Sequence, residues 1–302
     1  PAYRPPTLFL EIKMLQQTLK EPLIIKGIGL HSGCDSILVI NPAPVNTGIV
    51  FCRTDVVGAK PIAAVYHNVV DTRNCTCLGQ NGVLVSTIEH LMAALYAAQI
   101  DNAYIECNNQ ELPISDGSAK IFYEELVAAP KQKQNAGSKF IEVLKPVEFA
   151  DDKGASVKLL PNGGKALNVH FEIEFPSKIV GRQLFDEAVT PEVFGSKIAP
   201  CRTFCEKYQI EYLKSLGLIK GGSLDNAVVL DGDTILNPDG FRVKNECVNH
   251  KVLDLIGDMY TSGYRLSADV IAVRSGHFHN NEVLKKLFAD VANYKVFDGD
   301  EK

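Results

Sequence analysis

The segment APKQKQNAGSK, residues 129–139, divides the sequence into two parts. It is polar and basic, it contains Pro130 and Gly137, and its few apolar residues follow neither a helical nor a strand period. Such a composition is typical of a linker between folded units. We therefore expect one domain before this linker, at residues 14–128, and one after it, at residues 140–297, followed by a short tail at residues 298–302.

Working outward from the linker, strand-like runs come first in each half and helical stretches follow. In the first half we expect strands at 22–27, 36–40 and 103–107, and helices at 87–99 and 119–128. In the second half we expect strands at 140–149, 155–160, 167–174 and 266–273, a hairpin at 226–243, and helices at 207–217, 246–262 and 281–292. Strands ahead of helices indicate an α+β fold rather than an alternating parallel sheet.

Composition excludes several classes of protein. The 302 residues are 46% hydrophobic and 22% charged, enough to bury a substantial core. A net charge of −5 argues against a nucleic-acid-binding protein, because phosphate binding needs a basic surface. No apolar run approaches the roughly 18–20 residues that span a bilayer, and the start shows no secretory signal, so we expect a cytoplasmic protein without stable membrane insertion. Residues 1–13, ahead of Met14, are interpreted as a leader. The eight cysteines form no CxxC pair, and we interpret them as reduced thiols.

The segment NHKVLDLIGD, residues 249–258, is the most informative for chemistry. If it is helical, His250, Asp254 and Asp258 lie along one face, while the apolar residues between them supply a buried surface. A histidine and an aspartate at i and i+4 are a natural pair of metal ligands. The alternative is a solvated polar face without a ligand.

The segment VSTIEHLMAAL, residues 85–95, offers a third ligand. Ser86 and Glu89 fit the S-x-x-E capping box, so Glu89 could serve only to cap a helix, and His90 could be an ordinary core histidine. Catalytic zinc, however, takes three protein ligands and leaves one position for water. His90 would complete that set, and the neighbouring carboxylate of Glu89 could accept the proton of the water.

The segment RSGHFHNNE, residues 274–282, contains a candidate general acid. His277 is expected in the connection between a strand ending near Val273 and a helix starting near Asn281, where functional side chains are often exposed. A histidine there could protonate a departing amine, and Asp258 could hold its ring and raise its pKa. The alternative is a loop histidine without a function.

Together these motifs resemble one enzyme family, the UDP-3-O-acyl-N-acetylglucosamine deacetylases of lipid A biosynthesis. The resemblance runs in the correct order from about residue 15 to residue 293. It is carried by KGIGLHSG (26–33), IEH (88–90) within VSTIEHLMAAL, PISDGSA (113–119), RTF (202–204), GGSLDNA (221–227), HKVLDLIGD (250–258) and SGHFHNN (275–281).

The resemblance implies a two-domain α+β sandwich. Each domain would be a β-sheet with two helices, and the helix layers would pack between the sheets with the metal in the cleft between the domains. Residues 175–200 match an insert that forms a passage for the acyl chain. The resemblance also implies a monomer that acts in the cytoplasm of a Gram-negative bacterium.

The resemblance assigns roles to individual residues. His90, His250 and Asp254 match the ligands of Zn²⁺, although the same ligand set also suits Fe²⁺. Glu89 matches the general base, His277 the general acid, and Asp258 the carboxylate that orients this acid. The remaining matches concern the substrate: Thr203 stabilises the oxyanion, Phe204 contacts the substrate, Lys251 and His31 lie at the sugar and phosphates, and Phe175 packs on the nucleotide or sugar. Cys75 falls where some members carry a ligand of a second, inhibitory zinc.

The implied activity is hydrolysis of the N-acetyl group of UDP-3-O-acyl-N-acetylglucosamine. The products would be acetate and UDP-3-O-acyl-glucosamine, in an early committed step of lipid A synthesis, and the partner would be the acylated UDP-sugar rather than a nucleic acid. Two alternatives stay open on the residues alone. One is a zinc hydrolase of another amide, and the other is a binding protein that keeps the metal but has lost turnover.

Overall fold

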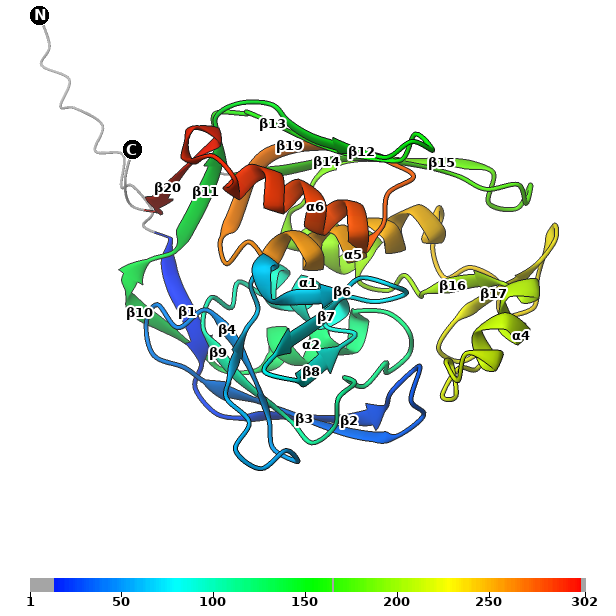
Figure 1. The fold of residues 1–302 in the computed structure, drawn as a ribbon, viewed down its shortest axis with the longest axis horizontal. Helices are drawn as coiled ribbons and strands as arrows, with labels where there is room; N and C mark the ends of the chain where they lie inside the picture. The colour runs from blue at the N-terminus through cyan, green and yellow to red at the C-terminus, as the bar shows by residue number, and fades with distance from the viewer. Residues whose placement is uncertain (1–13, 165, 300–302) are drawn as a thin grey trace, which may run out of the picture.

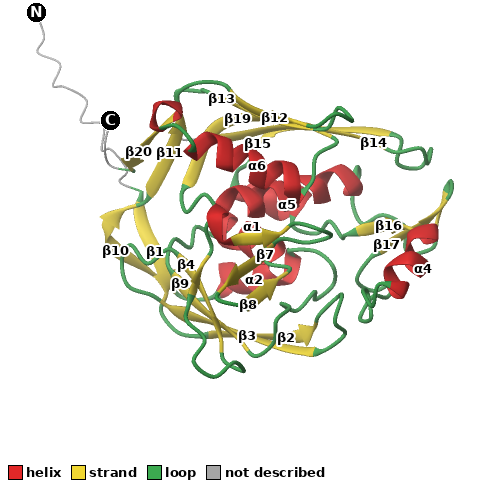
Figure 2. Cartoon of the chain, in the orientation of Figure 1, coloured by secondary structure: helices red, strands yellow, loops and turns green. Residues whose placement is uncertain are grey.

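Two β-sheets enclose a double layer of helices in the computed structural model, which describes residues 14–164 and 166–299 (Figure 1). The helices of this layer are α1 (Glu89–Ala97), α2 (Lys120–Ala128), α5 (Glu246–Tyr260) and α6 (His277–Phe288). Figure 2 shows them at the centre, with strands above and below. The α+β class predicted from the sequence is confirmed. The leader predicted at 1–13 and the last three residues of the predicted tail lie outside the described residues.

The sheet of the first half has the order β2-β3-β9-β4-β5. Its strands are β2 (Leu23–Ile28), β3 (Asp35–Pro42), β9 (Ala103–Cys107), β4 (Ile49–Arg53) and β5 (Ile62–Ala63). Side chains along β3 point alternately to the two faces of the sheet, so that Ser36, Leu38 and Ile40 point inward, as expected for a strand with one buried face. A smaller sheet lies beside α1 and consists of β6 (Val69–Asp71), β7 (Cys77–Gln80) and β8 (Val83–Ser86).

The sheet of the second half is organised around β19 (Arg265–Val273). This strand pairs in parallel with β11 (Lys139–Val143) and with β14 (Leu167–Glu174), and antiparallel with β13 (Ser156–Leu160). The outer strands are β12 (Val147–Ala150), β15 (Arg182–Ala188) and β20 (Tyr294–Asp298). The inward residues of β14, which are Leu167, Val169, Phe171 and Ile173, join the single hydrophobic core that extends through both halves.

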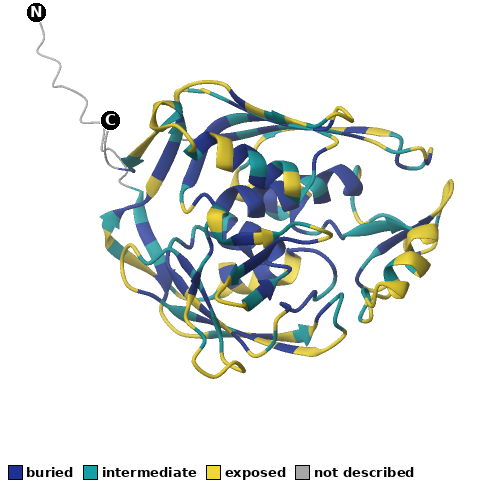
Figure 3. Cartoon of the chain, in the orientation of Figure 1, coloured by how far each residue is buried: buried dark blue, intermediate teal, exposed yellow. Residues whose placement is uncertain are grey.

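The two halves meet where α1 packs against α5. A Cβ atom at Gly257 of α5 would overlap the carbonyl oxygen of Glu89 and lie 2.8 Å from its carbonyl carbon. The close approach of the two helix backbones therefore requires a residue without a side chain at this position. Figure 3 shows both helices almost entirely buried. In the described part of the chain, no helix is both long and apolar enough to cross a membrane.

The predicted linker is wrong as a description of local structure. Within 129–139, residues Lys131–Gly137 form strand β10, which pairs antiparallel with β1 (Leu15–Leu19). The residues of β10 are mostly polar, and Gln134 ties the strand to neighbouring segments: its amide donates to the Ala43 carbonyl, and its oxygen accepts from Asn102. A search for apolar periodicity therefore misses this strand. The domain boundaries themselves stay a prediction.

Other boundaries differ for identifiable reasons. The strand predicted at 140–149 is two strands, β11 and β12, separated around Pro146, which has no N–H for a sheet ladder. The last helix begins at His277 instead of Asn281, so His277 is a helical residue. The helix predicted at 207–217 is confirmed as α4 (Lys207–Ser215). The predicted hairpin contains β17 (Val228–Asp231) and β18 (Thr234–Ile235).

A small unit projects from the body of the molecule next to the helix layers (Figure 1). It contains β16 (Phe204–Glu206), which pairs in parallel with β17, together with α4 and β18. No residue of α4 is buried, although the helix has an apolar side formed by Ile210 and Leu213. The short elements α3 (Pro191–Val193) and η2 (Phe194–Ile198) precede this unit, while η1 (Tyr66–Asn68) and η3 (Val291–Asn293) lie elsewhere.

Candidate metal and catalytic site

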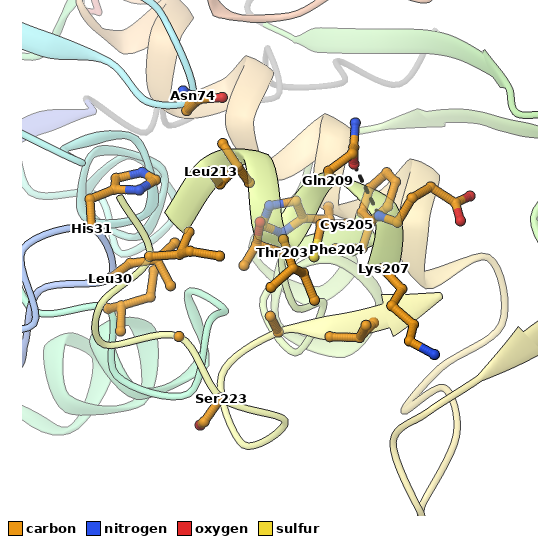
Figure 4. A pocket seen from close by; sticks show the side chains of 18 of the residues that line it. Leu30, His31, Asn74, Thr203, Phe204, Cys205, Lys207, Gln209, Leu213 and Ser223 are labelled. Carbon is orange, nitrogen blue, oxygen red and sulfur yellow. Dashed lines mark hydrogen bonds between the residues drawn. The ribbon is translucent and has the colours of Figure 1, made fainter. Parts of the chain in front are cut away.

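A cavity of about 1210 Å³ lies between the projecting unit and the ends of α1, α5 and α6. Eight polar residues predicted from the sequence line it: His31, Glu89, His90, Thr203, His250, Lys251, Asp254 and His277. Figure 4 shows side chains of the loop around His31 on one side and of β16 and α4 on the other. Of the predicted insert 175–200, only Phe175 is among the lining residues, whereas residues 203–236 form much of the wall. The acyl passage at 175–200 stays a prediction.

Three buried side chains form a group that could hold a metal ion. The Nε2 atoms of His90 and His250 lie 3.6 Å and 3.5 Å from Oδ1 of Asp254, and the ligand atoms of the three residues are all within 4.8 Å of one another. Tetrahedral zinc with bonds near 2.05 Å separates its ligand atoms by about 3.4 Å. The spacing therefore fits a small divalent cation. The prediction that His250 and Asp254 lie one turn apart on a helix is confirmed, because both belong to α5.

The surroundings prepare these ligands for a cation. Nδ1 of His250 lies 3.0 Å from the carbonyl oxygen of Cys201, which can only accept, so Nδ1 carries the proton and Nε2 keeps its lone pair. Burial lowers the pKa of His250 to about 4, which keeps the imidazole neutral at neutral pH. Lys251 donates to Oδ2 of Asp254 at 2.7 Å. Burial alone would raise the pKa of Asp254, but Lys251 and the surrounding histidine side chains together lower it. Within the donor set, His250 thus offers a neutral imidazole and Asp254 an ionised carboxylate.

Glu89 is the first residue of α1, and its side chain is buried. Its Oε2 accepts a hydrogen bond from the amide of Thr76 at 2.9 Å. The capping-box interpretation is wrong, because Ser86 ends β8, and the residue that caps α1 is Ile88, without a side-chain cap. Burial raises the pKa of Glu89, and the nearby His277 and His90 oppose this effect. A carboxylate with a raised pKa beside a candidate metal site is suited to accept a proton.

His277 is held by a buried carboxylate. Its Nδ1 lies 2.8 Å from Oδ2 of Asp258, which leaves Nε2 as the ring atom available in the cavity. Burial alone would lower the pKa of His277, but the charge and hydrogen bond of Asp258 raise it to about 9. The ring is therefore protonated at neutral pH, and it can donate a proton. Asp258 lies on α5 one turn beyond Asp254, as the spacing predicted.

The predicted substrate contacts from the second half come together beside the ligands. Thr203 lines the cavity, and its backbone is fixed by hydrogen bonds to Gly117 and Val228. Its hydroxyl has no hydrogen-bond partner within the described residues, so it is free to contact a ligand. The ring of Phe204 packs edge-on against His250 at 6.3 Å between centroids, and Phe175 packs against Phe204 at 5.3 Å.

His31 lines the same cavity from the first half. The loop that carries it is anchored by Glu111, whose two carboxylate oxygens accept from the amides of His31 and Ser32 at 2.8 Å and 2.7 Å. Burial lowers the pKa of His31. Cys75 is buried, and burial followed by the charge of Glu89 raises the pKa of its thiol. This environment disfavours the thiolate that a metal would need, and Cys75 is not part of the ligand group found in the described residues.

Several supporting residues were missed by the sequence analysis. Asn280 donates to Oδ2 of Asp258 at 2.8 Å. A predicted helix beginning at His277 would have placed Asn280 on the same helix face as His277, because the two residues are three positions apart. The Thr76 hydroxyl donates to Oδ1 of Asp258. Arg202, next to Thr203, forms a buried ion pair with Glu246 at 2.9 Å. No local pattern marks Thr76 or this ion pair, because their partners are distant in sequence.

Comparisons with known proteins identify the family of this chain. The profile of the UDP-3-O-acyl N-acetylglycosamine deacetylase family matches residues 16–289. Three relatives, all named UDP-3-O-acyl-N-acetylglucosamine deacetylase, are similar along nearly their whole length. The protein of Syntrophotalea carbinolica is 41% identical over 95% of this chain and 92% of its own. That of Histophilus somni is 43% identical over 95% and 94%, and that of Phenylobacterium zucineum is 43% identical over 94% and 96%.

Proposed function

The chain belongs to the UDP-3-O-acyl N-acetylglycosamine deacetylase family, and on this premise we propose that it is a zinc-dependent hydrolase. It removes the N-acetyl group of UDP-3-O-acyl-N-acetylglucosamine, the compound named in its relatives. The products are acetate and UDP-3-O-acyl-glucosamine, which enters lipid A synthesis. The observation that carries this proposal is the placement of Glu89 and His277 in one cavity with the His90, His250 and Asp254 group.

The ligand group supports a catalytic metal rather than a structural one. Three ligands leave a coordination position open, as catalytic zinc sites do. A bound divalent ion would supply Lewis acidity toward the carbonyl and lower the pKa of water toward about 7. Zinc is proposed over iron because two imidazoles and one carboxylate with tetrahedral spacing suit it, although the set itself also accepts Fe²⁺.

Glu89 and His277 divide the proton transfers. Glu89 accepts a proton from the attacking water, and His277, protonated below about pH 9, donates one to the departing nitrogen. The two groups need opposite protonation states at the same pH. The buried Asp258 keeps His277 charged, and His277 in turn opposes the rise that burial causes in the pKa of Glu89. Asp258 keeps the His277 ring oriented.

The remaining residues bind the substrate. The free hydroxyl of Thr203 donates to the oxygen of the amide carbonyl as negative charge develops there. Lys251 and His31 contact the sugar and phosphates, and both residues line the cavity. The cavity volume of about 1210 Å³ exceeds the range of roughly 300–1,000 Å³ that is typical of small-molecule sites, which supports a substrate that combines a nucleotide with an acyl chain.

The proposal includes a cellular setting. We place the enzyme in the cytoplasm of a Gram-negative bacterium as a monomer, on the strength of the family resemblance. The acidic net charge of −5 supports the absence of a nucleic-acid partner.

The deciding experiment combines metal analysis with a deacetylase assay of Glu89→Ala. We expect this variant to retain about one zinc per chain and to lose about 10²- to 10⁴-fold in kcat, the usual contribution of a general base. Glu124→Ala, on the exposed face of α2, is the matched control and should behave as wild type. Activity near wild type with zinc bound would contradict the role of Glu89.

Substrate preference separates this proposal from a hydrolase of another amide. We expect turnover of UDP-3-O-acyl-N-acetylglucosamine to exceed that of UDP-N-acetylglucosamine, which lacks the acyl chain. Equal kcat/KM for both would argue against an acyl-specific enzyme. Metal binding without turnover of either compound would instead favour the non-catalytic alternative.

A further inference from the structure

Thr76 lies in the first half but reaches the catalytic residues of both halves. It precedes β7 in the segment that connects β6 to β7, and only 2% of its surface is exposed. Both of its polar donors contact a residue of the proposed acid–base machinery. The threonine itself does not line the cavity, so it has no part in contacting substrate.

The amide of Thr76 fixes one oxygen of the proposed base. It donates to Oε2 of Glu89 at 2.9 Å, and this is the only hydrogen bond to the Glu89 side chain among the described residues. Oε1 is thereby left as the oxygen that can accept a proton from water. Because a main-chain donor has little freedom, it restrains the carboxylate to one orientation.

The hydroxyl of Thr76 fixes the carboxylate behind the proposed acid. It donates to Oδ1 of Asp258 at 2.5 Å, while Asn280 and His277 both contact Oδ2 at 2.8 Å. These three contacts leave the buried carboxylate no freedom to rotate. The hydroxyl therefore decides which oxygen of Asp258 faces His277.

We propose that Thr76 is a positioning residue that joins the general base to the general acid. Its amide orients Glu89 and its hydroxyl orients Asp258, and through Asp258 it orients His277. Its β-branched side chain has few rotamers, which suits a residue that must hold two groups at once. This inference rests on the proposed function, since it assigns Thr76 a role in that reaction.

The test compares Thr76→Val, which keeps the shape but removes the hydroxyl, with Thr76→Ser, which keeps the hydroxyl. We expect Thr76→Val to lower kcat about 10- to 100-fold with KM changed less than about threefold, since it removes a hydrogen bond to a charged group. Thr76→Ser should stay within about threefold of wild type. Both should retain wild-type zinc content. Thr18→Val, another buried threonine whose hydroxyl donates to the Asn102 carbonyl at 2.8 Å, is the matched control and should keep wild-type kcat.

A proton NMR measurement tests this inference separately from the proposed function. In the zinc-loaded protein, the proton on Nδ1 of His277 should resonate far downfield, because its hydrogen bond to Asp258 is charge-assisted. Thr76→Val should shift this resonance and Thr76→Ser should not, whether or not the protein turns over the expected substrate. An unchanged resonance in Thr76→Val overturns the inference even if the enzyme is a deacetylase.

The kinetic outcomes are equally decisive. Thr76→Val with kcat within threefold of wild type overturns the proposal, as does Thr76→Ser with a loss equal to that of Thr76→Val. Should Thr76→Val fail to fold, Thr76→Ala, which also lacks the hydroxyl but adds no bulk, replaces it with the same expected results.

Discussion

Oδ2 of Asp258 lies 2.8 Å from Nδ1 of His277, and both side chains are at least nine-tenths enclosed by protein. The pair combines residues from two elements, α5 and the first turn of α6. An imidazole in this setting carries a proton well above the pH at which a free histidine loses it, because the aspartate outweighs the effect of burial.

The first prediction concerns the pH dependence of activity. The pKa of His277 is raised to about 9, so the ring is protonated below this pH and kcat/KM should fall as the pH rises through about 9. Asp258→Asn removes the charge that raises this pKa, and the basic limb should then move to lower pH. Profiles of kcat/KM against pH for both proteins measure the shift. An unchanged limb in Asp258→Asn would mean that another group controls it.

The second prediction concerns removal of the metal. Treatment with a chelator should abolish deacetylation and lower the melting temperature, because an ion that binds only the folded state stabilises it, by about 2.7 kcal/mol at 100 times its Kd. Added Zn²⁺ should restore both properties. His250→Ala should bind little zinc, whereas His170→Ala, a half-exposed histidine of β14, should bind it normally. Full zinc content in His250→Ala would remove this residue from the ligand set.

The third prediction concerns the contact between α1 and α5. Gly257→Ala places a Cβ atom against the carbonyl group of Glu89, so the helices must separate. We expect a loss of about 1–3 kcal/mol in the free energy of unfolding, together with reduced kcat because Glu89 and His90 move. Urea denaturation and kinetic assays measure the two effects. Gly164→Ala, whose Cβ meets no atom closer than 3.9 Å, is the control, and equal behaviour of the two variants would argue against the contact.

The fourth prediction concerns the ion pair beside Thr203. Glu246 accepts from Nε and the amide of Arg202, both at 2.9 Å, and also from the amide of Arg242. Glu246→Ala leaves the buried Arg202 charge unpaired, so we expect a loss of about 3–5 kcal/mol in the free energy of unfolding. The exposed pair of Glu187 and Lys197 is the comparison, and Glu187→Ala should cost at most about 1 kcal/mol. Similar losses in the two variants would show that burial does not matter here.

Helix periodicity made part of the site predictable. The spacing of His250, Asp254 and Asp258 placed them on one face of a helix, and the structure confirms that α5 carries all three. The segments around Glu89, His90 and His277 offered these three residues as candidates, and the family resemblance assigned their roles. The elements that were found from the sequence, such as β9, β14 and α4, are those whose own apolar pattern is strong.

The rest depended on contacts that leave no local trace. Thr76 and Asp258 are 182 residues apart, and nothing near either one indicates the other. Strand β10 was missed because its residues are mostly polar and show no apolar alternation, and Glu89 matched a capping box that the fold does not form. In each case a tertiary partner, absent from any short window of sequence, decided the outcome.

The glycine at 257 also limits what could be transplanted from this protein. A designer who copies the three ligands, the base and the acid into another helical scaffold reproduces side chains only. The distance between the two ligand-bearing backbones is set here by a position that contributes no side-chain atoms. A graft onto helices kept further apart by larger residues would hold the same side chains too far apart to share one ion, so a faithful copy must begin with the helix spacing.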